Sequence, residues 1–173
     1  MKVEVVPHNP DWKNLFAAEA KQWLNLLNSD VIAIHHIGST AIPNIHAKPI
    51  IDLLIVVKDI DNVDKNNTAI TAENYDIMGE FGIVGRRYFR KHNSAGNRTH
   101  HIHIYQQDSP EIQRHLAFRD YMITHPEDAK EYSKLKQELA LKHPEDIESY
   151  MDGKDQFIKD IDQKAVEWVK NNP

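Results

Sequence analysis

The sequence of 173 residues contains no cysteine. This absence excludes disulfide bridges, thiolate metal sites and a cysteine nucleophile, and it suits a reducing compartment. No stretch approaches the roughly 18 consecutive apolar residues that a membrane span needs, and the opening MKVEVVPHNPDWKNLF has no apolar segment behind a basic one. We therefore expect a cytoplasmic protein that has no membrane partner.

A surplus of basic residues is lacking as well. The chain has 21 Lys and Arg against 26 Asp and Glu, a formal net charge of −5. This balance gives no support to duplex nucleic acid as a partner. The glycine patterns of a P-loop (GxxxxGK[ST]) and of a dinucleotide-binding fold (GxGxxG) are also absent, so these two phosphate-binding modes are excluded.

Hydrophobic patterning predicts one compact α+β unit. Apolar residues recur at helical spacing over 12–27, with Glu19 on or beside the apolar stripe. The runs VIAIHHIG (31–38) and PIIDLLIVV (49–57) are typical of neighbouring core strands, and 81–106 alternates about a turn as a hairpin does. We expect an α/β core over 1–107 and a helical part over 108–173 packed on it.

Turn signals divide the rest of the chain. The polar span 58–74 could hold a helix, although its periodicity is weak. From Ser109 onward the pattern is helical, and Ser109-Pro110, His125-Pro-Glu-Asp and His143-Pro-Glu-Asp each place proline and acidic residues where a first helical turn favours them. Three C-terminal helices are therefore predicted.

The predicted hairpin is unusual in charge. Between Phe81 and Gln107 there are five Arg or Lys, four His and no Asp or Glu. Arg86, Arg87 and Arg90, with Arg114 and Arg119 of the following helix, could clamp a polyanion through bidentate hydrogen bonds. The alternative is a solvated hairpin whose basic side chains pair with the acidic helices.

Asp52 lies within an apolar strand, where neither face of the strand looks solvated. Burial of an unpaired carboxylate costs several kcal/mol, so Asp52 requires a cation, a metal or several hydrogen-bond donors. One interpretation is a structural ion pair with Lys48 or with an arginine of the hairpin. The other is a metal ligand at the edge of a pocket.

Two further features lie close to these residues in the sequence. His101 and His103 share one face of a strand, and two imidazoles at that spacing can bind one metal ion. The turn Gly38-Ser39-Thr40 follows a predicted strand directly, where glycine allows close approach of the backbone and hydroxyl and N–H groups can hold phosphate oxygens.

Several separated motifs resemble the GrpB-like family. They are HIGSTAIPNIHAKPIIDLLIVV, HIHIY, RHLAFRDYMITHPEDAKEYSKLKQELA and YMDGKDQFIKDIDQKAVEW, and with the opening VVPHNPDW they span most of the chain. The resemblance implies a nucleotidyltransferase-like fold, with a small mixed sheet, flanking helices and a helical C-terminal part. Members of this family are also found fused to dephospho-CoA kinase.

The same resemblance implies which residues form a site. Gly38 and Ser39 match the turn that holds a nucleotide triphosphate in active nucleotidyltransferases, and Asp52 matches the first metal-binding carboxylate. The second carboxylate position is Leu54, and His101 or His103 stands where a later strand carries an acid. One aspartate and two histidines suit a single divalent ion, Mn²⁺ or Zn²⁺ in preference to a pair of Mg²⁺.

The predicted function is binding of a nucleotide or another phosphorylated ligand with a divalent metal, with transfer of a nucleotidyl group as the possible reaction. Asp52 and His103 would be catalytic, Asp52, His101 and His103 would hold the metal, and the phosphate-binding set is Gly38, Ser39, Thr40, Lys48, Arg87 and Arg90. Two alternatives stay open: an inactive module that binds a nucleotide or a CoA-like ligand, and a structural or partner-binding protein.

Overall fold

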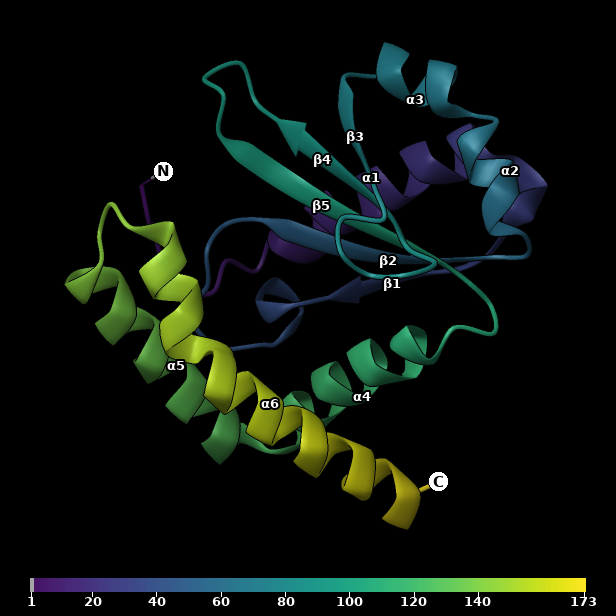
Figure 1. The fold of residues 1–173 in the computed structure, drawn as a ribbon. Coiled ribbons are helices and arrows are strands. Elements are labelled where there is room, and N and C mark those ends of the chain that lie inside the picture. Colours follow the sequence, from purple (N-terminus) through teal and green to yellow (C-terminus); the bar gives the residue numbers. More distant parts are fainter. Residues whose placement is uncertain (1) are drawn as a thin grey trace. The chain divides into compact units, whose positions relative to one another are not determined.

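The computed structural model describes residues 2–173, which form helices and one five-stranded sheet (Figure 1). The chain divides into two compact units, each built from separate stretches of sequence. We call Pro10–Ile37 with Ile50–Ile112 the sheet unit, and Met1–Asn9 with Gly38–Pro49 and Gln113–Pro173 the helical unit. The division at residues 107 and 108 that the sequence predicts stays a prediction.

The sheet has the strand order β1-β2-β5-β4-β3. Its strands are β1 (Val31–Ile37), β2 (Ile51–Val57), β3 (Tyr75–Gly79), β4 (Arg87–His92) and β5 (Arg98–Gln106). β2 and β5 are parallel and every other pair of neighbours is antiparallel. The predicted neighbouring core strands and the predicted hairpin are confirmed. β3 was not predicted, because as an edge strand it buries little and shows only weak alternation.

Helix α1 (Trp12–Leu27) contacts β1 and β2, as its apolar stripe predicts. Its Trp23 is fully buried and lies against the rings of Tyr75 and Phe89, at centroid distances of 4.8 and 5.3 Å. The polar span after β2 forms two short helices, α2 (Ile60–Asp64) and α3 (Asn67–Ala72), and η1 (Asn28–Asp30) joins α1 to β1.

Strand alternation gives the two faces of the sheet different chemistry. On the α1 face, Leu53, Ile102 and Phe89 lie in register across three strands and are almost completely buried. Asp52 precedes Leu53 on β2, His101 precedes Ile102 on β5, and Arg90 follows Phe89 on β4. The register therefore places these three polar residues together on the opposite face. The sheet thus buries an apolar face and presents a polar one.

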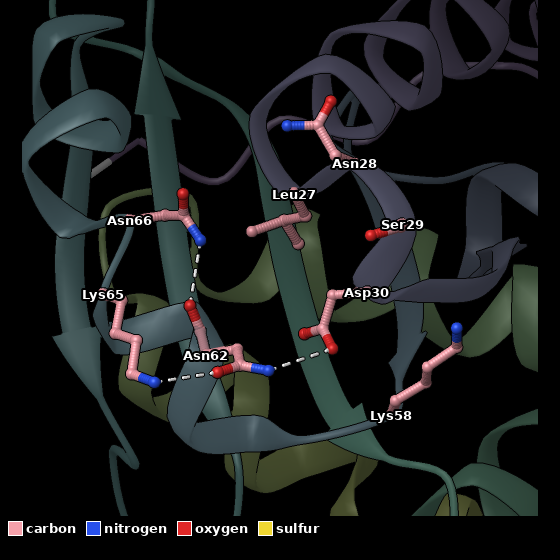
Figure 2. A pocket seen from close by; sticks show the side chains of 8 residues that line it. All are labelled: Leu27, Asn28, Ser29, Asp30, Lys58, Asn62, Lys65 and Asn66. Carbon is pink, nitrogen blue, oxygen red and sulfur yellow. Dashed lines mark hydrogen bonds between the residues drawn. The ribbon is translucent and has the colours of Figure 1, made fainter.

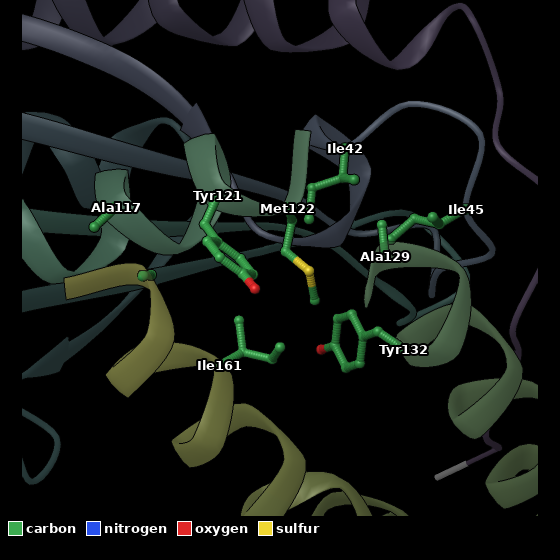
Figure 3. Packing of buried hydrophobic residues seen from close by; sticks show 9 residues of the cluster. Ile42, Ile45, Ala117, Tyr121, Met122, Ala129, Tyr132 and Ile161 are labelled. Carbon is green, nitrogen blue, oxygen red and sulfur yellow. The ribbon is translucent and has the colours of Figure 1, made fainter. Parts of the chain in front are cut away.

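The helical unit contains most of α4 (Pro110–Thr124) together with α5 (Pro126–Lys142), α6 (Ile147–Asn171) and the short turn η2 (Ser39–Ala41). α5 and α6 lie side by side (Figure 1). At Gly153 they approach so closely that a Cβ atom would require the Leu139 side chain to move. Figure 3 shows the core cluster of this unit, which consists of Ile42, Ile45, Ala117, Tyr121, Met122, Ala129, Tyr132, Ile161 and Ala165.

The three predicted C-terminal helices are confirmed, with one correction at the third. Pro144 and Glu145 precede α6, and its N-cap is Asp146, whose carboxylate accepts a hydrogen bond from the Ser149 N–H at 3.1 Å. An aspartate at this position satisfies an otherwise unpaired backbone donor, so the helix begins after the acidic residue. The α+β prediction of a small mixed sheet with flanking helices and a helical C-terminal part is confirmed. Among residues 2–173, no helix is both long enough and apolar enough to cross a membrane.

Candidate functional site

The candidate site of the sheet unit is centred on Asp52, the second residue of β2. It pairs with Ile37 at the end of β1 on one side and with His101 of β5 on the other. The sequence predicts a buried carboxylate, but 24% of the Asp52 side chain is exposed. β2 lies inside the sheet, between β1 and β5, yet the exposed part of the side chain leaves Asp52 accessible to a ligand.

Two imidazoles face the same oxygen of Asp52. His103 Nε2 lies 3.1 Å from Oδ1 and His101 Nδ1 lies 3.5 Å from it. The sequence offered Lys48 or an arginine of the hairpin as the partner of Asp52, whereas the partners in the structure are the two histidines of β5. Strand alternation and the parallel register of β2 and β5 bring the three side chains together.

The protonation states of this group follow from its hydrogen bonds. Burial raises the pKa of Asp52, but hydrogen bonds from His101 and His103 outweigh it and hold the pKa well below its ordinary value. Burial lowers the pKa of His103, and this outweighs the opposite effect of Asp52. At neutral pH, Asp52 is therefore ionised and His103 is neutral.

Arg86 fixes the tautomer of His103. Its Nη1 lies 3.4 Å from His103 Nδ1, and a guanidinium group can only donate. Nδ1 must therefore accept, so that the single proton of the neutral ring sits on Nε2 and is donated to Asp52. The sequence marked Arg86 only as one of several arginines that could clamp a polyanion, and not as a partner of His103. The absence of acidic residues around it was the signal that could have found it.

The loop between β3 and β4 holds Arg86 in place. Arg86 donates from Nη2 to the carbonyl of Phe81 at 2.8 Å and from Nε to the carbonyl of Glu80 at 3.1 Å. Phe81 itself has φ of +46°, a left-handed conformation that costs free energy for a bulky residue. The loop is thus shaped to aim carbonyl oxygens at one guanidinium group.

Arg90 and Tyr88 complete the polar face. The ring of Tyr88 stacks on His103 at 5.1 Å between centroids, and the Tyr88 hydroxyl accepts a hydrogen bond from Arg90 Nε at 3.2 Å. The Arg90 guanidinium lies 4.8 Å from the Phe81 ring centre. Within residues 2–173 it forms no ion pair with a carboxylate. Its capacity for bidentate hydrogen bonds therefore remains available to an anion.

The structure does not bring Arg87 and Arg90 together. They are three residues apart on β4, so strand alternation places them on opposite faces of the sheet. Arg87 donates to both carboxylate oxygens of Asp64 in α2, at 2.8 and 3.1 Å, and this pairing raises the pKa of Arg87. A phosphate-binding role for Arg87 stays a prediction.

The predicted phosphate-binding turn belongs to the helical unit. Gly38 has φ of +75° and ψ of −174°, a conformation that is essentially restricted to glycine. Its carbonyl accepts a hydrogen bond from the Ala41 N–H at 3.1 Å, which closes a tight turn over Ser39 and the buried Thr40. Lys48 of the same unit lies with Nζ 5.4 Å from the ring centre of Tyr150. Their phosphate-binding roles stay predictions.

The predicted metal was tested against the positions of the side chains. Among residues 2–173, no three His, Asp or Glu side chains are arranged as a group that could hold a metal ion. As the residues lie, His101 and His103 direct their nitrogens at a single oxygen of Asp52 as hydrogen-bonding partners. The arrangement does not fit a preformed metal site, so the function proposed for this face does not depend on a metal ion held by these three residues alone.

A second hollow of the sheet unit lies away from Asp52. It has a volume of about 500 Å³ and is lined by Leu27, Asn28, Ser29, Asp30, Lys58, Asn62, Lys65 and Asn66 (Figure 2). Asp30 precedes β1, whereas Asp52 pairs with the last residue of β1, so the two sites are separated by the length of the strand, about 20 Å. Its lining is mostly polar and includes neither a histidine nor an arginine, which makes it a weaker candidate than the Asp52 face.

Comparison with known proteins identifies the family. The sequence pattern described as GrpB protein matches residues 2–164. The chain belongs to the GrpB family. It is 47% identical over 169 residues to the UPF0157 protein YqkA of Bacillus subtilis, covering 98% of this chain. The crystal structure of the conserved protein GrpB from Enterococcus faecalis has a TM-score of 0.91 at 44% identity and covers 96% of this chain and 99% of that one.

This member of the GrpB family spans only part of some of its relatives. The matched region is 49% of YqkA and 47% of a dephospho-CoA kinase of Mycolicibacterium paratuberculosis, to which the chain is 26% identical. The predicted occurrence of the family beside dephospho-CoA kinase agrees with the second match. A crystal structure of Cid1 poly(U) polymerase matches at a TM-score of 0.46 and 14% identity, covering 79% of this chain and 45% of that one. A likeness of this size says nothing about activity.

Proposed function

We propose that the polar face of the sheet unit binds a phosphorylated small molecule, with nucleotides as the first candidates. The observation that carries this proposal is the Arg90 guanidinium, which lies without a carboxylate partner among residues 2–173 on the same face as Asp52, His101 and His103. Two guanidinium groups, Arg86 and Arg90, accompany one carboxylate there, so the face has an excess of positive charge that favours an anion.

The residues have distinct roles in this proposal. Arg90 is the phosphate ligand, because a guanidinium group matches two phosphate oxygens at once. Arg86 is a positioning residue that holds His103 in one tautomer. Asp52 and the Nε2 proton of His103 form a ready donor and acceptor pair for a ligand hydroxyl. A divalent ion would enter only with the ligand, whose phosphate oxygens would supply the ligands that the protein lacks.

Transfer of a nucleotidyl group is the finer form of the proposal. Two-metal catalysis of that reaction needs several carboxylates, and Leu54, two residues beyond Asp52 on the same face, is fully buried and apolar. This observation favours the second candidate function, a binding module without turnover. Leu54→Asp distinguishes them: transfer gained by this variant would mean that the scaffold can catalyse and lacks one ligand.

The test is thermal unfolding of the whole chain with ATP, the other nucleoside triphosphates and CoA, each with and without Mg²⁺, Mn²⁺ or Zn²⁺. A ligand at about a hundred times its Kd stabilises the native state by about 2.7 kcal/mol, which raises the midpoint by several degrees. Arg90→Gln and Asp52→Asn are expected to lose most of this rise. Arg98→Gln, which removes a positive charge at the start of β5, is the matched control and should keep it.

Two results would contradict the proposal. One is a midpoint of thermal unfolding of the wild type that none of the ligands raises, with or without any of the metal ions. The other is an Arg90→Gln variant that binds as tightly as the wild type, since the free guanidinium group would then have no part in binding.

A further inference from the structure

Lys136 is the most unusual charged residue of the helical unit. It lies in the middle of α5 with 1% of its surface exposed. Its Nζ has no hydrogen-bond partner within residues 2–173. Lysine is almost never fully buried unless it is paired, and burial of a charge without a partner is costly. The fold gives Lys136 no acceptor, which is a reason to look for one outside the chain.

Two more lysines lie within electrostatic range of Lys136, over a second aromatic ring of the same unit. Lys136 Nζ lies 4.3 Å from the ring centre of Tyr132, while Lys154 Nζ of α6 and Lys48 Nζ lie 5.0 and 5.4 Å from that of Tyr150. Each lysine comes from a different segment of the helical unit. The Tyr150 hydroxyl is buried and, in the part of the chain that the structure describes, also lacks a hydrogen-bond partner.

In the lysine cluster (Lys48, Lys136 and Lys154), the surroundings of Lys136 disfavour its protonated form. Burial is the main cause that lowers the pKa of Lys136 to about 6, and the positive charges of Lys154 and Lys48 lower it further. At neutral pH the free protein therefore holds Lys136 mostly as a neutral amine. An anion placed among the three side chains would reverse this balance, because it would attract all three charges at once.

We propose that Lys48, Lys136 and Lys154, with the hydroxyl of Tyr150, form an oxyanion-binding site that takes the phosphate group of a small molecule. Three ammonium groups and one hydroxyl supply donors from several directions, which suits the oxygens of a di- or triphosphate. Lys48 is half-buried, unlike the other two, so the site is entered on its side.

This site is independent of the one proposed on the sheet unit. All four of its residues belong to the helical unit, and none of the observations behind it involves Asp52 or Arg90. Packing alone does not account for the cluster. A leucine or methionine would fill the same volume in α5 without bringing a buried amine next to two further lysines.

The experiment measures binding of inorganic phosphate, pyrophosphate and tripolyphosphate to the whole chain by calorimetry, with sodium chloride at matched ionic strength as the blank. We expect binding that strengthens with the charge of the anion. Lys136→Met and Lys154→Met should each weaken it by about 10-fold or more. Lys134→Met and Lys164→Met remove exposed lysines from the same two helices and are the matched controls, which should bind as the wild type does.

A second readout separates a binding role from a merely structural one. If Lys136 is neutral in the free protein and charged beside the anion, binding takes up about one proton at neutral pH. Calorimetry in two buffers of different ionisation enthalpy measures this uptake, and Lys136→Met should abolish it. ATP and adenosine tested side by side show whether a nucleoside adds to the phosphate contribution.

Three outcomes would overturn the proposal: no binding of any of the three phosphates, equal binding by wild type and Lys136→Met, or binding without proton uptake. If Lys136→Met did not fold, the affinity of Lys154→Met would decide. Failure here leaves the Arg90 experiment untouched, because that test uses residues of the sheet unit alone.

Discussion

The most deeply buried charged side chains of the two units, Glu19 and Lys136, have opposite kinds of surroundings. Glu19, on α1 of the sheet unit, is 5% exposed. Its carboxylate accepts from the Tyr75 hydroxyl and from Lys91 Nζ at 3.0 Å, and His100 Nε2 lies 3.6 Å away. Lys136 of the helical unit is 1% exposed and has aromatic rings and other lysines around it in place of acceptors.

The difference shows how to tell a structural charge from one that awaits a ligand. A buried charge whose partners are all supplied by the chain ties elements together, as Glu19 joins α1 to β3, β4 and β5. A buried charge without partners costs stability in the free protein, and an external counter-ion can repay that cost. Asp52 lies between these cases, since it has two partners from the chain and an exposed quarter of its side chain.

The largest effect should come from Glu19→Ala. The change leaves the Tyr75 hydroxyl and His100 without their acceptor, and we expect the free energy of unfolding to fall by about 3 kcal/mol, near the lower end for a broken buried pair. The lower end applies because 34% of the Lys91 side chain is exposed and can regain water. Chemical denaturation measures this loss. Glu73→Ala, at an exposed position, should change the stability by less than about 0.5 kcal/mol.

Lys136→Met should have the opposite sign. In buffer free of phosphate, removal of the unpartnered amine is expected to raise the free energy of unfolding by about 1–3 kcal/mol. Lys134→Met, two residues away and exposed, should leave it within about 0.5 kcal/mol. Denaturation of the two variants beside the wild type checks the difference. A loss of stability in Lys136→Met would mean that the chain itself compensates this charge, and the contrast with Glu19 would disappear.

The stability difference between wild type and Lys136→Met should also depend on pH. The pKa of Lys136 is about 6 in the folded protein against an ordinary value of 10.5, so between these values only the unfolded chain binds the proton. The wild type therefore gains stability relative to the variant as pH rises from 6 towards 10.5, and below 6 the difference is constant. For one proton the slope approaches about 1.4 kcal/mol per pH unit midway between these two values.

The neighbours of Lys136 do not obscure this pH dependence. The titratable groups that face it, Lys48, Lys154, Tyr132 and Tyr150, are present in both proteins, and burial raises the pKa of Tyr150 above its ordinary value. Their contributions largely cancel in the difference. A difference that did not change between neutral and alkaline pH would show that Lys136 keeps its proton in the folded state.

The sequence predicted the sheet unit better than the chemistry of its site. Alternation placed His101 and His103 on one face, and the apolar run around Asp52 identified the central strand, because both signals are local. Periodicity alone did not pair Asp52 with the histidines, since the parallel pairing of β2 with β5 brings together residues 49 positions apart. Only the family resemblance grouped the three residues, as metal ligands. Arg87 and Arg90 were grouped in one clamp, although their spacing of three on a strand places them on opposite faces. The ion pair with Asp64 of α2 separates Arg87 further.

Lys136 and Lys154 were missed although the sequence contains a signal for both. Ala129, Tyr132, Lys136 and Leu139 recur at helical spacing and are all buried, as are Tyr150, Lys154 and Ile161 in α6. The same argument placed Glu19 on the stripe of α1. A charged residue inside an apolar stripe is therefore worth marking, but whether the fold supplies its partner depends on distant residues and cannot be predicted from spacing.

The smallest effect should come from the exposed pair of Arg87 and Asp64, which is the reference for both buried charges. Arg87 donates to both carboxylate oxygens of Asp64, but the Asp64 side chain is 45% exposed, so water competes with Arg87 for the carboxylate. A double-mutant cycle with Arg87→Gln and Asp64→Asn should give a coupling of about 0.2–1 kcal/mol that falls with added salt. A coupling near that of Glu19 with its donors would mean that burial does not set the strength of these contacts, and the distinction between the Glu19 and Lys136 sites would then need another physical basis.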